Sequence, residues 1–258
     1  MMNPLKKTWL ACSMALVVLL AIAGCSKNES TGPAEQPSTA AQPAGTPIDK
    51  STVGSVSGTV KFDGAKPKAA KIDMSQDPAC KGDNTVEALV GDDGNLANVF
   101  VYVKEGLNRS FDVPTTAVEI NQEGCRYHPH VLGVMAGQTV KIVNSDNTTH
   151  NIHPTPANNR EWNESQPPKG APLEKTFARE EIMLPVKCNQ HPWMKMFINV
   201  SKSPYFAVTG ADGKYEIKDL PPGDYTIAFV QEKMPEQTQK ITVAPKAAVT
   251  ADATFKAQ

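Results

Sequence analysis

The sequence lacks an excess of either charge, lacks the motifs of common enzyme classes and has almost no long apolar run. Its 26 basic residues nearly balance 27 acidic residues, which argues against nucleic acid as a partner. It contains no nucleotide-binding loop, no catalytic serine elbow and no zinc-hydrolase motif. No long segment repeats apolar residues at helical spacing. These absences leave the few histidines and cysteines as the carriers of chemistry.

The one long apolar run, residues 10–23, lies at the N-terminus and is too short for a comfortable membrane span. It is followed by Cys25, and residues 22–25 (Ile-Ala-Gly-Cys) resemble the bacterial lipobox. The resemblance implies that residues 1–25 are a lipoprotein signal peptide, cleaved before Cys25, whose sulfur and amino group then carry lipid. In a bacterium with two membranes, the resemblance further implies that Ser26, in place of aspartate after the cysteine, directs the protein to the outer membrane, facing the periplasm. The alternative is an ordinary secretory signal with a chance cysteine.

The rest of the chain has the pattern of an all-β protein. Residues 26–52 hold four prolines among small and polar residues, as expected of a disordered tether. From Val53 onward, short β-branched and aromatic runs alternate with glycine, proline and aspartate turns. Residues 154–172 are polar and proline-rich and are expected to form a loop. Strands are expected near residues 56–62, 98–103, 118–120, 131–134, 139–143, 182–186, 194–200, 206–208, 215–217, 225–229 and 241–243.

The densest group of metal-binding side chains lies in residues 188–194, Cys-Asn-Gln-His-Pro-Trp-Met. A second imidazole, His150, follows an upstream β-rich run. Two imidazoles and a thiolate, with a thioether held farther away, are the donors of a type-1 copper site. The soft thiolate favours copper over hard ions such as magnesium, and imidazole suits both copper oxidation states. The alternative without a metal is a buried thiol with two ordinary polar histidines.

Residues 188–194 resemble the ligand loop of the cupredoxins, most closely the amicyanin type. Residues 144–152, which end in His-Asn-Ile, resemble the segment that carries the family's first histidine. The resemblance covers residues 112–202 and implies a Greek-key β-sandwich that binds one Cu(I)/Cu(II) ion. The ligands that it implies are His150, Cys188 and His191 in the equatorial plane and Met194 in the axial position.

The same resemblance implies roles for neighbouring residues. Asn151 would tie the two ligand loops together, with its backbone N–H directed at the thiolate. His191 would form a partly exposed edge through which electrons pass. Pro192 and Trp193 would then belong to an apolar docking patch.

Some alternatives for the ligand set stay open. Met196 gives a second permitted spacing from Cys188, although its place on a strand favours a role in the core. His128 and His130 precede a strand that should border the site. Either one could supply a second or substitute ligand, and the competing interpretation is that both are polar residues at a strand start.

Three cysteines remain once Cys12 leaves with the signal and Cys25 is lipidated. In a compartment that favours disulfides, three thiols cannot all pair within one chain. If Cys188 is a metal ligand, Cys80 and Cys125 are free to form a disulfide, although sequence alone does not prove the pairing.

Residues 208–227 resemble a carboxypeptidase-regulatory-like β-sandwich of the transthyretin-like group, a family that usually opens with a strand like residues 56–61. This predicts one sandwich built from residues 53–111 and 203–257, interrupted by a cupredoxin domain at residues 112–202. The alternative is two consecutive domains.

The function expected from these features is one-electron transfer by a lipid-anchored copper protein that is not an enzyme. Its partners would be envelope redox proteins such as c-type cytochromes or a dehydrogenase. Three alternatives are a copper storage or handling protein, an enzyme with an open copper position where His130 replaces Met194, and a metal-free adhesion or sugar-binding module.

Overall fold

The computed structural model describes residues 47–257, apart from residues 69, 82–89 and 92. The described residues all belong to one compact unit, residues 42–258. The predicted signal peptide with Cys25, and the predicted tether up to residue 46, lie outside the described residues. Residues 47–52 were expected in the tether, but they form a turn in which the Thr52 N–H donates to the Asp49 carbonyl, and Ile48 packs on a hydrophobic core. Within the described ranges, no helix has the length and apolar character needed to cross a membrane.

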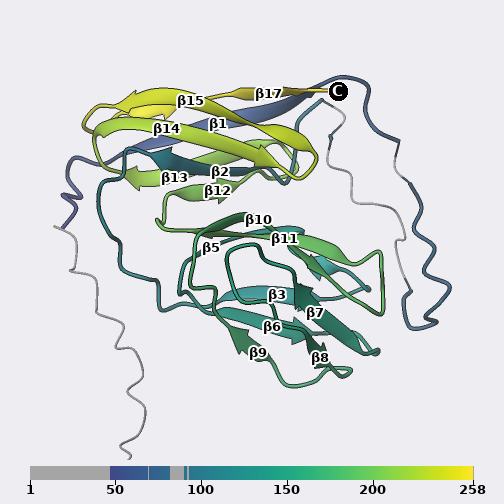
Figure 1. Ribbon diagram of the computed structural model, residues 1–258. Helices are drawn as coiled ribbons and strands as arrows, with labels where there is room; N and C mark the ends of the chain where they lie inside the picture. The colour runs from purple at the N-terminus through teal and green to yellow at the C-terminus, as the bar shows by residue number, and fades with distance from the viewer. Residues whose placement is uncertain (1–46, 69, 82–89, 92, 258) are drawn as a thin grey trace, which may run out of the picture. The chain divides into compact units, whose positions relative to one another are not determined.

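The first and last strands of the chain form one β-sandwich, here called the host sandwich. Figure 1 shows β1 lying among the last strands of the chain, and β1 pairs with β13, β16 and β17. The other sheet has the order β12-β2-β14-β15. The strands are β1 (Gly54–Asp63), β2 (Phe100–Glu105), β12 (Phe206–Val208), β13 (Lys214–Leu220), β14 (Gly223–Gln231), β15 (Met234–Val243), β16 (Ala248–Thr250) and β17 (Ala253–Lys256).

The chain between β2 and β12 forms a second β-sandwich, here called the inserted sandwich. One sheet has the order β5-β11-β10-β7-β8 and the other has the order β4-β3-β6-β9. Its strands are β3 (Val118–Gln122), β4 (Tyr127–His128), β5 (Val131–Met135), β6 (Val140–Asn144), β7 (His150–Pro154), β8 (Glu164–Gln166), β9 (Leu173–Lys175), β10 (Glu181–Lys187) and β11 (Lys195–Ser201). The described residues contain no helix, so the predicted all-β fold, one sandwich inserted into another, is confirmed.

The two sandwiches share an apolar contact. Phe100 and Phe206 of the host sandwich pack with Val131 and Phe197 of the inserted sandwich. Gly133 on β5 permits this approach, because a Cβ atom there would lie 2.6 Å from the Phe206 ring. Such close packing fixes the inserted sandwich on its host.

A histidine–carboxylate pair joins the same two sandwiches at the β14–β15 turn. His130 Nε2 lies 3.1 Å from Glu232 Oε2, and both side chains are largely buried. Burial raises the pKa of Glu232, but the hydrogen bond and charge of His130, with help from Lys233, outweigh it and place that pKa below its usual value. The pair therefore stabilises the fold when Glu232 is ionised.

This pair predicts a specific pH dependence of stability. Because the pKa of Glu232 is lowered by folding, its contribution is present above the ordinary value of 4.5 and is lost as the pH falls through the folded-state pKa. We expect Glu232→Gln to cost about 1 kcal/mol at neutral pH, and less at pH 3. Urea unfolding at several pH values measures this difference. The matched control is Glu119→Gln, which breaks only an exposed pair with Lys141 and should change little.

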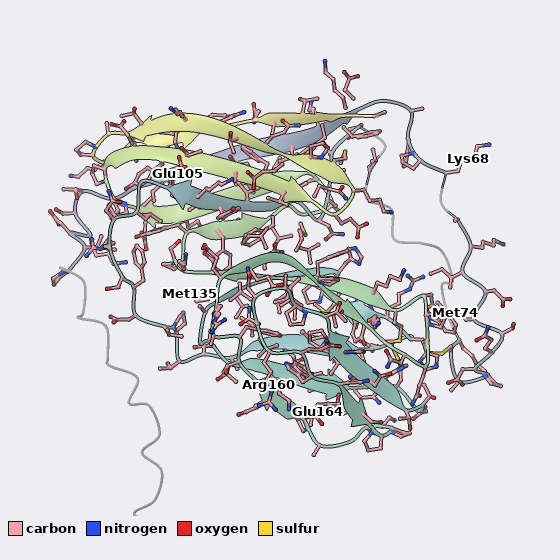
Figure 2. The ribbon with its side chains drawn as sticks, viewed as in Figure 1. Lys68, Met74, Glu105, Met135, Arg160 and Glu164 are labelled. Carbon is pink, nitrogen blue, oxygen red and sulfur yellow. A yellow bond between two sulfur atoms is a disulfide. The ribbon has the colours of Figure 1, made fainter. Side chains whose placement is uncertain are left out.

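One segment crosses from the host sandwich to the inserted one. Residues 70–81, here called the arm, lie between β1 and β2 in sequence, within the range predicted for the host. Nevertheless Ile72 and Met74 pack on the core of the inserted sandwich. Figure 2 shows Met74 on the arm beside that sandwich. Cys80 forms a disulfide with Cys125. The assignment of the whole of residues 53–111 to the host is therefore corrected by this arm.

Candidate metal centre

The loop between β10 and β11 presents three candidate ligands from one tight turn. The two strands are antiparallel neighbours, and their pairing ends at Lys187 opposite Lys195. Inside the loop, the Met194 N–H donates to the His191 carbonyl at 2.9 Å, and the Cys188 N–H donates to the Met194 carbonyl at 3.2 Å. The side chains of Cys188, His191 and Met194 are all buried. The short loop therefore directs all three side chains into the protein.

His150 reaches the same point from a different strand. It begins β7, whose other end pairs with β10, and its side chain is completely buried. The Nδ1 atoms of His150 and His191 lie 2.9 Å apart, and Cys188 Sγ lies 3.7 Å from His191 Nδ1. One possible ligand atom from each of these three residues lies within 4.8 Å of the others. The structure thus brings together the three predicted equatorial ligands.

The remaining ring nitrogen of each histidine faces a carboxylate. His150 Nε2 lies 2.8 Å from Asp146 Oδ2, and His191 Nε2 lies 3.0 Å from Asp77 Oδ2. Hydrogen bonds from Thr148 and from the Ala79 N–H, with His191, hold the pKa of Asp77 at about 2, so this group is ionised at neutral pH. An ionised carboxylate only accepts hydrogen bonds, so His191 Nε2 is the donor to Asp77, and Asp146 is placed to accept from His150 Nε2 in the same way.

This arrangement leaves the two Nδ1 atoms as bare acceptors that face each other. Burial lowers the pKa of His150 below its ordinary value, against the opposing effect of Asp146. Protonating His150 is therefore an unfavourable way to remove the repulsion between the two Nδ1 lone pairs. A metal ion bound by both Nδ1 atoms resolves it. The nearby thiol selects a soft or borderline transition metal, and the residues present therefore fit a copper ion.

Asn151 ties the two ligand segments together through its side chain. Its Oδ1 accepts the backbone N–H of Asn189 at 2.8 Å and lies 3.3 Å from Cys188 Sγ. Its Nδ2 donates to Asn163 Oδ1 at 2.7 Å. The two contacts of Oδ1 link β7 to the Cys188 loop. They are made by the side-chain amide, whereas the sequence interpretation assigned the thiolate contact to the backbone N–H.

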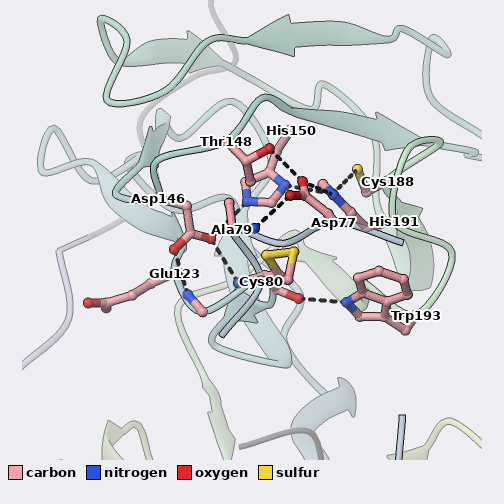
Figure 3. Close-up of a disulfide and its surroundings, with 12 residues drawn as sticks. Asp77, Ala79, Cys80, Glu123, Asp146, Thr148, His150, Cys188, His191 and Trp193 are labelled. Atoms are coloured by element: carbon pink, nitrogen blue, oxygen red, sulfur yellow. Dashed lines mark hydrogen bonds and ion pairs between the residues drawn. A yellow bond between two sulfur atoms is a disulfide. The ribbon is translucent and has the colours of Figure 1, made fainter. Parts of the chain in front are cut away.

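The predicted exposure of His191 is wrong. Its side chain is only 4% exposed, because Asp77 of the arm lies against Nε2, as Figure 3 shows. The Cys80–Cys125 disulfide holds the arm beside the same histidine. Asp77 and Asp146 were both missed from the sequence. The available signal was the pairing of Cys80 with Cys125, which would have placed the segment containing Asp77 close to the site.

His128 and His130, the two possible substitute ligands, lie apart from this cluster. His128 is exposed and its Nε2 lies 3.2 Å from the Glu123 carbonyl, whereas His130 pairs with Glu232. Neither belongs to the ligand groups found among the described residues. Met196 is buried within β11 opposite Val186, whereas Met194 lies before that strand, at the end of the ligand loop.

Trp193 and Pro192 lie at the rim of the site. The Trp193 indole donates to the Cys125 carbonyl at 3.1 Å, and its ring centroid lies 5.2 Å from that of His191. Pro192 is exposed and Trp193 is half-buried. Both line a cleft of about 310 Å³, together with Met194 and with Glu232 of the host sandwich.

Two comparisons describe what the chain is similar to. Residues 196–256 match the model of the carboxypeptidase regulatory-like domain. This match covers β12 to β17 of the host sandwich, and it begins within β11 of the inserted sandwich, at Met196. The chain has no significant match among curated proteins.

Solved structures similar to the chain include three copper proteins. A copper-containing nitrite reductase from Thermus scotoductus is 20% identical, with a TM-score of 0.31, over 39% of this chain and 25% of that one. A purple cupredoxin from Nitrosopumilus maritimus is 25% identical, with a TM-score of 0.28, over 33% of this chain and 99% of that one. A Cu(I) form of an amicyanin variant is 21% identical, with a TM-score of 0.30, over 39% of this chain and 98% of that one.

This chain therefore spans only a quarter of the nitrite reductase, but nearly the whole of the two small copper proteins. Because these TM-scores are low, the case for the copper site rests on the side-chain geometry described above.

Proposed function

We propose that the protein is a type-1 copper protein that transfers single electrons. The observation that carries the proposal is the convergence of two acceptor Nδ1 atoms and one buried thiol, with each Nε2 held by a carboxylate. When bound, copper supplies reversible one-electron chemistry between its Cu(I) and Cu(II) states.

Each candidate ligand has a distinct role in this proposal. Cys188 provides the thiolate, whose soft sulfur excludes hard ions, and His150 and His191 provide neutral imidazoles acceptable to both oxidation states. Met194 is the proposed axial ligand, because it ends the ligand loop and is buried there. Asn151 holds the loops in register, so the ligands need little rearrangement when the charge of the site changes.

Electrons would pass through the Trp193 side of the site rather than through an exposed histidine edge. His191 is buried, whereas the indole that contacts its ring reaches a cleft open to other proteins. We propose that the Pro192 and Trp193 rim is where an envelope redox partner docks, such as a c-type cytochrome or a dehydrogenase. Lipid on Cys25 would hold the protein at the outer membrane, facing the periplasm.

We propose electron transfer as the function in preference to catalysis at an open copper coordination position. His130, the residue that would replace Met194 in an enzyme-like site, is held by Glu232, and Met194 itself is almost completely buried. An enclosed four-ligand site also argues against copper delivery, which favours exchangeable ligands.

A redox titration of the copper-loaded protein, followed optically with and without azide, tests this function. The proposal expects one reversible electron per copper and no spectral response to azide. An azide-shifted spectrum would instead indicate an open site, and copper that a mild chelator removes readily would indicate a handling role.

The two methionines can be distinguished by matched substitutions. We expect Met194→Leu to keep copper but to raise the reduction potential and alter the visible spectrum. The reason is that the axial ligand of a type-1 site tunes the reduction potential of its copper. Met196→Leu removes a buried sulfur of similar volume two residues away and should change neither property. Potentiometry and optical spectra of both variants measure this difference, and the reverse result would assign the axial position to Met196.

A further inference from the structure

The arm places a carboxylate of the chain's N-terminal part directly behind a candidate copper ligand. Asp77 Oδ2 lies 3.0 Å from His191 Nε2, while His191 Nδ1 faces His150 Nδ1. Asp77 therefore lies at one side of the His191 ring, and the candidate copper site lies at the other. The sequence that supplies Asp77 is separated from the ligand loop by more than 100 residues.

Asp77 is itself held firmly. Its Oδ2 accepts a hydrogen bond from the Thr148 hydroxyl at 2.6 Å, and its Oδ1 accepts the Ala79 N–H at 2.8 Å. Three residues later, the Cys80 disulfide fixes the arm to Cys125. Met74 anchors the other side of the arm in the core of the inserted sandwich. Asp77 is thus built into the site by covalent, polar and apolar contacts.

We propose that Asp77 is a positioning residue of the copper site, supplied by the arm. It holds His191 as the Nε2–H tautomer, so that Nδ1 stays free to bind the metal, and it fixes the plane of the ring. Its negative charge makes the imidazole a stronger donor and favours the more highly charged Cu(II) state. It also covers the face of His191 that would otherwise meet solvent. The proposal rests on the copper function and adds a residue to it.

The predicted consequence is a weaker and differently tuned site without Asp77. Loss of a carboxylate behind a ligating histidine typically weakens metal binding by about 10–100-fold, which is the loss expected for Asp77→Ala. Asp77→Asn keeps an oxygen that accepts the Nε2–H bond but removes the charge. It should therefore retain most of the affinity while raising the reduction potential.

The test compares full-length wild type, Asp77→Ala, Asp77→Asn and Asp73→Asn. Asp73 is a matched control, because it is an exposed aspartate of the same arm whose Oδ1 accepts the Ser75 N–H at 3.0 Å. Copper affinity is measured by chelator competition, and the ring tautomer of His191 is measured in metal-free protein by nitrogen NMR. Circular dichroism establishes that each variant is folded.

The proposal expects a protonated Nε2 on His191 in wild type, Asp77→Asn and Asp73→Asn, and a mixture of tautomers in Asp77→Ala. Unchanged copper affinity and an unchanged tautomer in folded Asp77→Ala would overturn it. If Asp77→Ala does not fold, an Asp77→Asn protein with wild-type affinity and wild-type potential would overturn it instead.

The two proposals fail separately. Wild-type protein that binds no copper contradicts the electron-transfer function. If wild type binds copper and Asp77→Ala has the same copper affinity and the same His191 tautomer, only the role of Asp77 is contradicted.

Discussion

Replacing Cys188 by serine should abolish the intense visible absorption of the copper-loaded protein and weaken copper binding by more than about 100-fold. The absorption comes from charge transfer between a thiolate and copper, and Cys188 is the one free cysteine among the described residues. A hydroxyl is a hard and weakly acidic donor, so two imidazoles and a thioether are left to hold the ion.

The fold should survive this change, because serine is slightly smaller than cysteine and Asn151 still ties the loop to β7 through the Asn189 N–H. Optical titration with copper measures the absorption, and far-ultraviolet circular dichroism checks the fold. Met196→Leu is the matched control, since it removes a different buried sulfur and should leave the band in place. A serine variant that keeps the band would assign the copper to another site.

Removing the disulfide should cost about 4 kcal/mol of unfolding free energy. Cys80 and Cys125 are 45 residues apart, and closing a loop of that length restricts the unfolded chain by roughly this amount. The double variant Cys80→Ser/Cys125→Ser should therefore unfold at a much lower urea concentration.

Equilibrium urea unfolding of the double variant, compared with oxidised and reduced wild type, measures this loss. Reduced wild type is the matched control, because it lacks the bond but keeps both cysteines. The two should lose similar free energy. A loss below about 1 kcal/mol in both would mean that the arm is held by its other contacts alone.

The sequence predicted the strands whose own residues favour extended structure. The run near residues 98–103 and the run near residues 225–229 are rich in β-branched and aromatic residues, and they became β2 and β14. In contrast, β8 lies in a segment expected to be a loop. It is a strand because buried Gln166 bonds to Gln122 and to the Ile142 carbonyl, a tertiary arrangement that local composition does not reveal.

The ligand cluster was predictable because the motif itself carries the geometry. Cys188 and His191 share one short loop, and the third equatorial ligand was recognised from the sequence pair His150-Asn151. The environment of the cluster was not predictable in the same way. Asp77 reaches His191 from a segment more than 100 residues away, and no spacing rule connects the two. The burial of His191 depends on the same contact, and only the expected Cys80–Cys125 pairing pointed toward it.

One pair of spectra tests most directly whether the protein holds a type-1 copper ion. The soluble form that begins after Cys25 is titrated with Cu(II), and its optical and electron paramagnetic resonance spectra are recorded. We expect saturation at one copper per chain, an intense thiolate-to-copper band and the narrow copper hyperfine splitting of a type-1 site. A folded protein that stays colourless, or that shows the resonance of copper without a thiolate ligand, would contradict it.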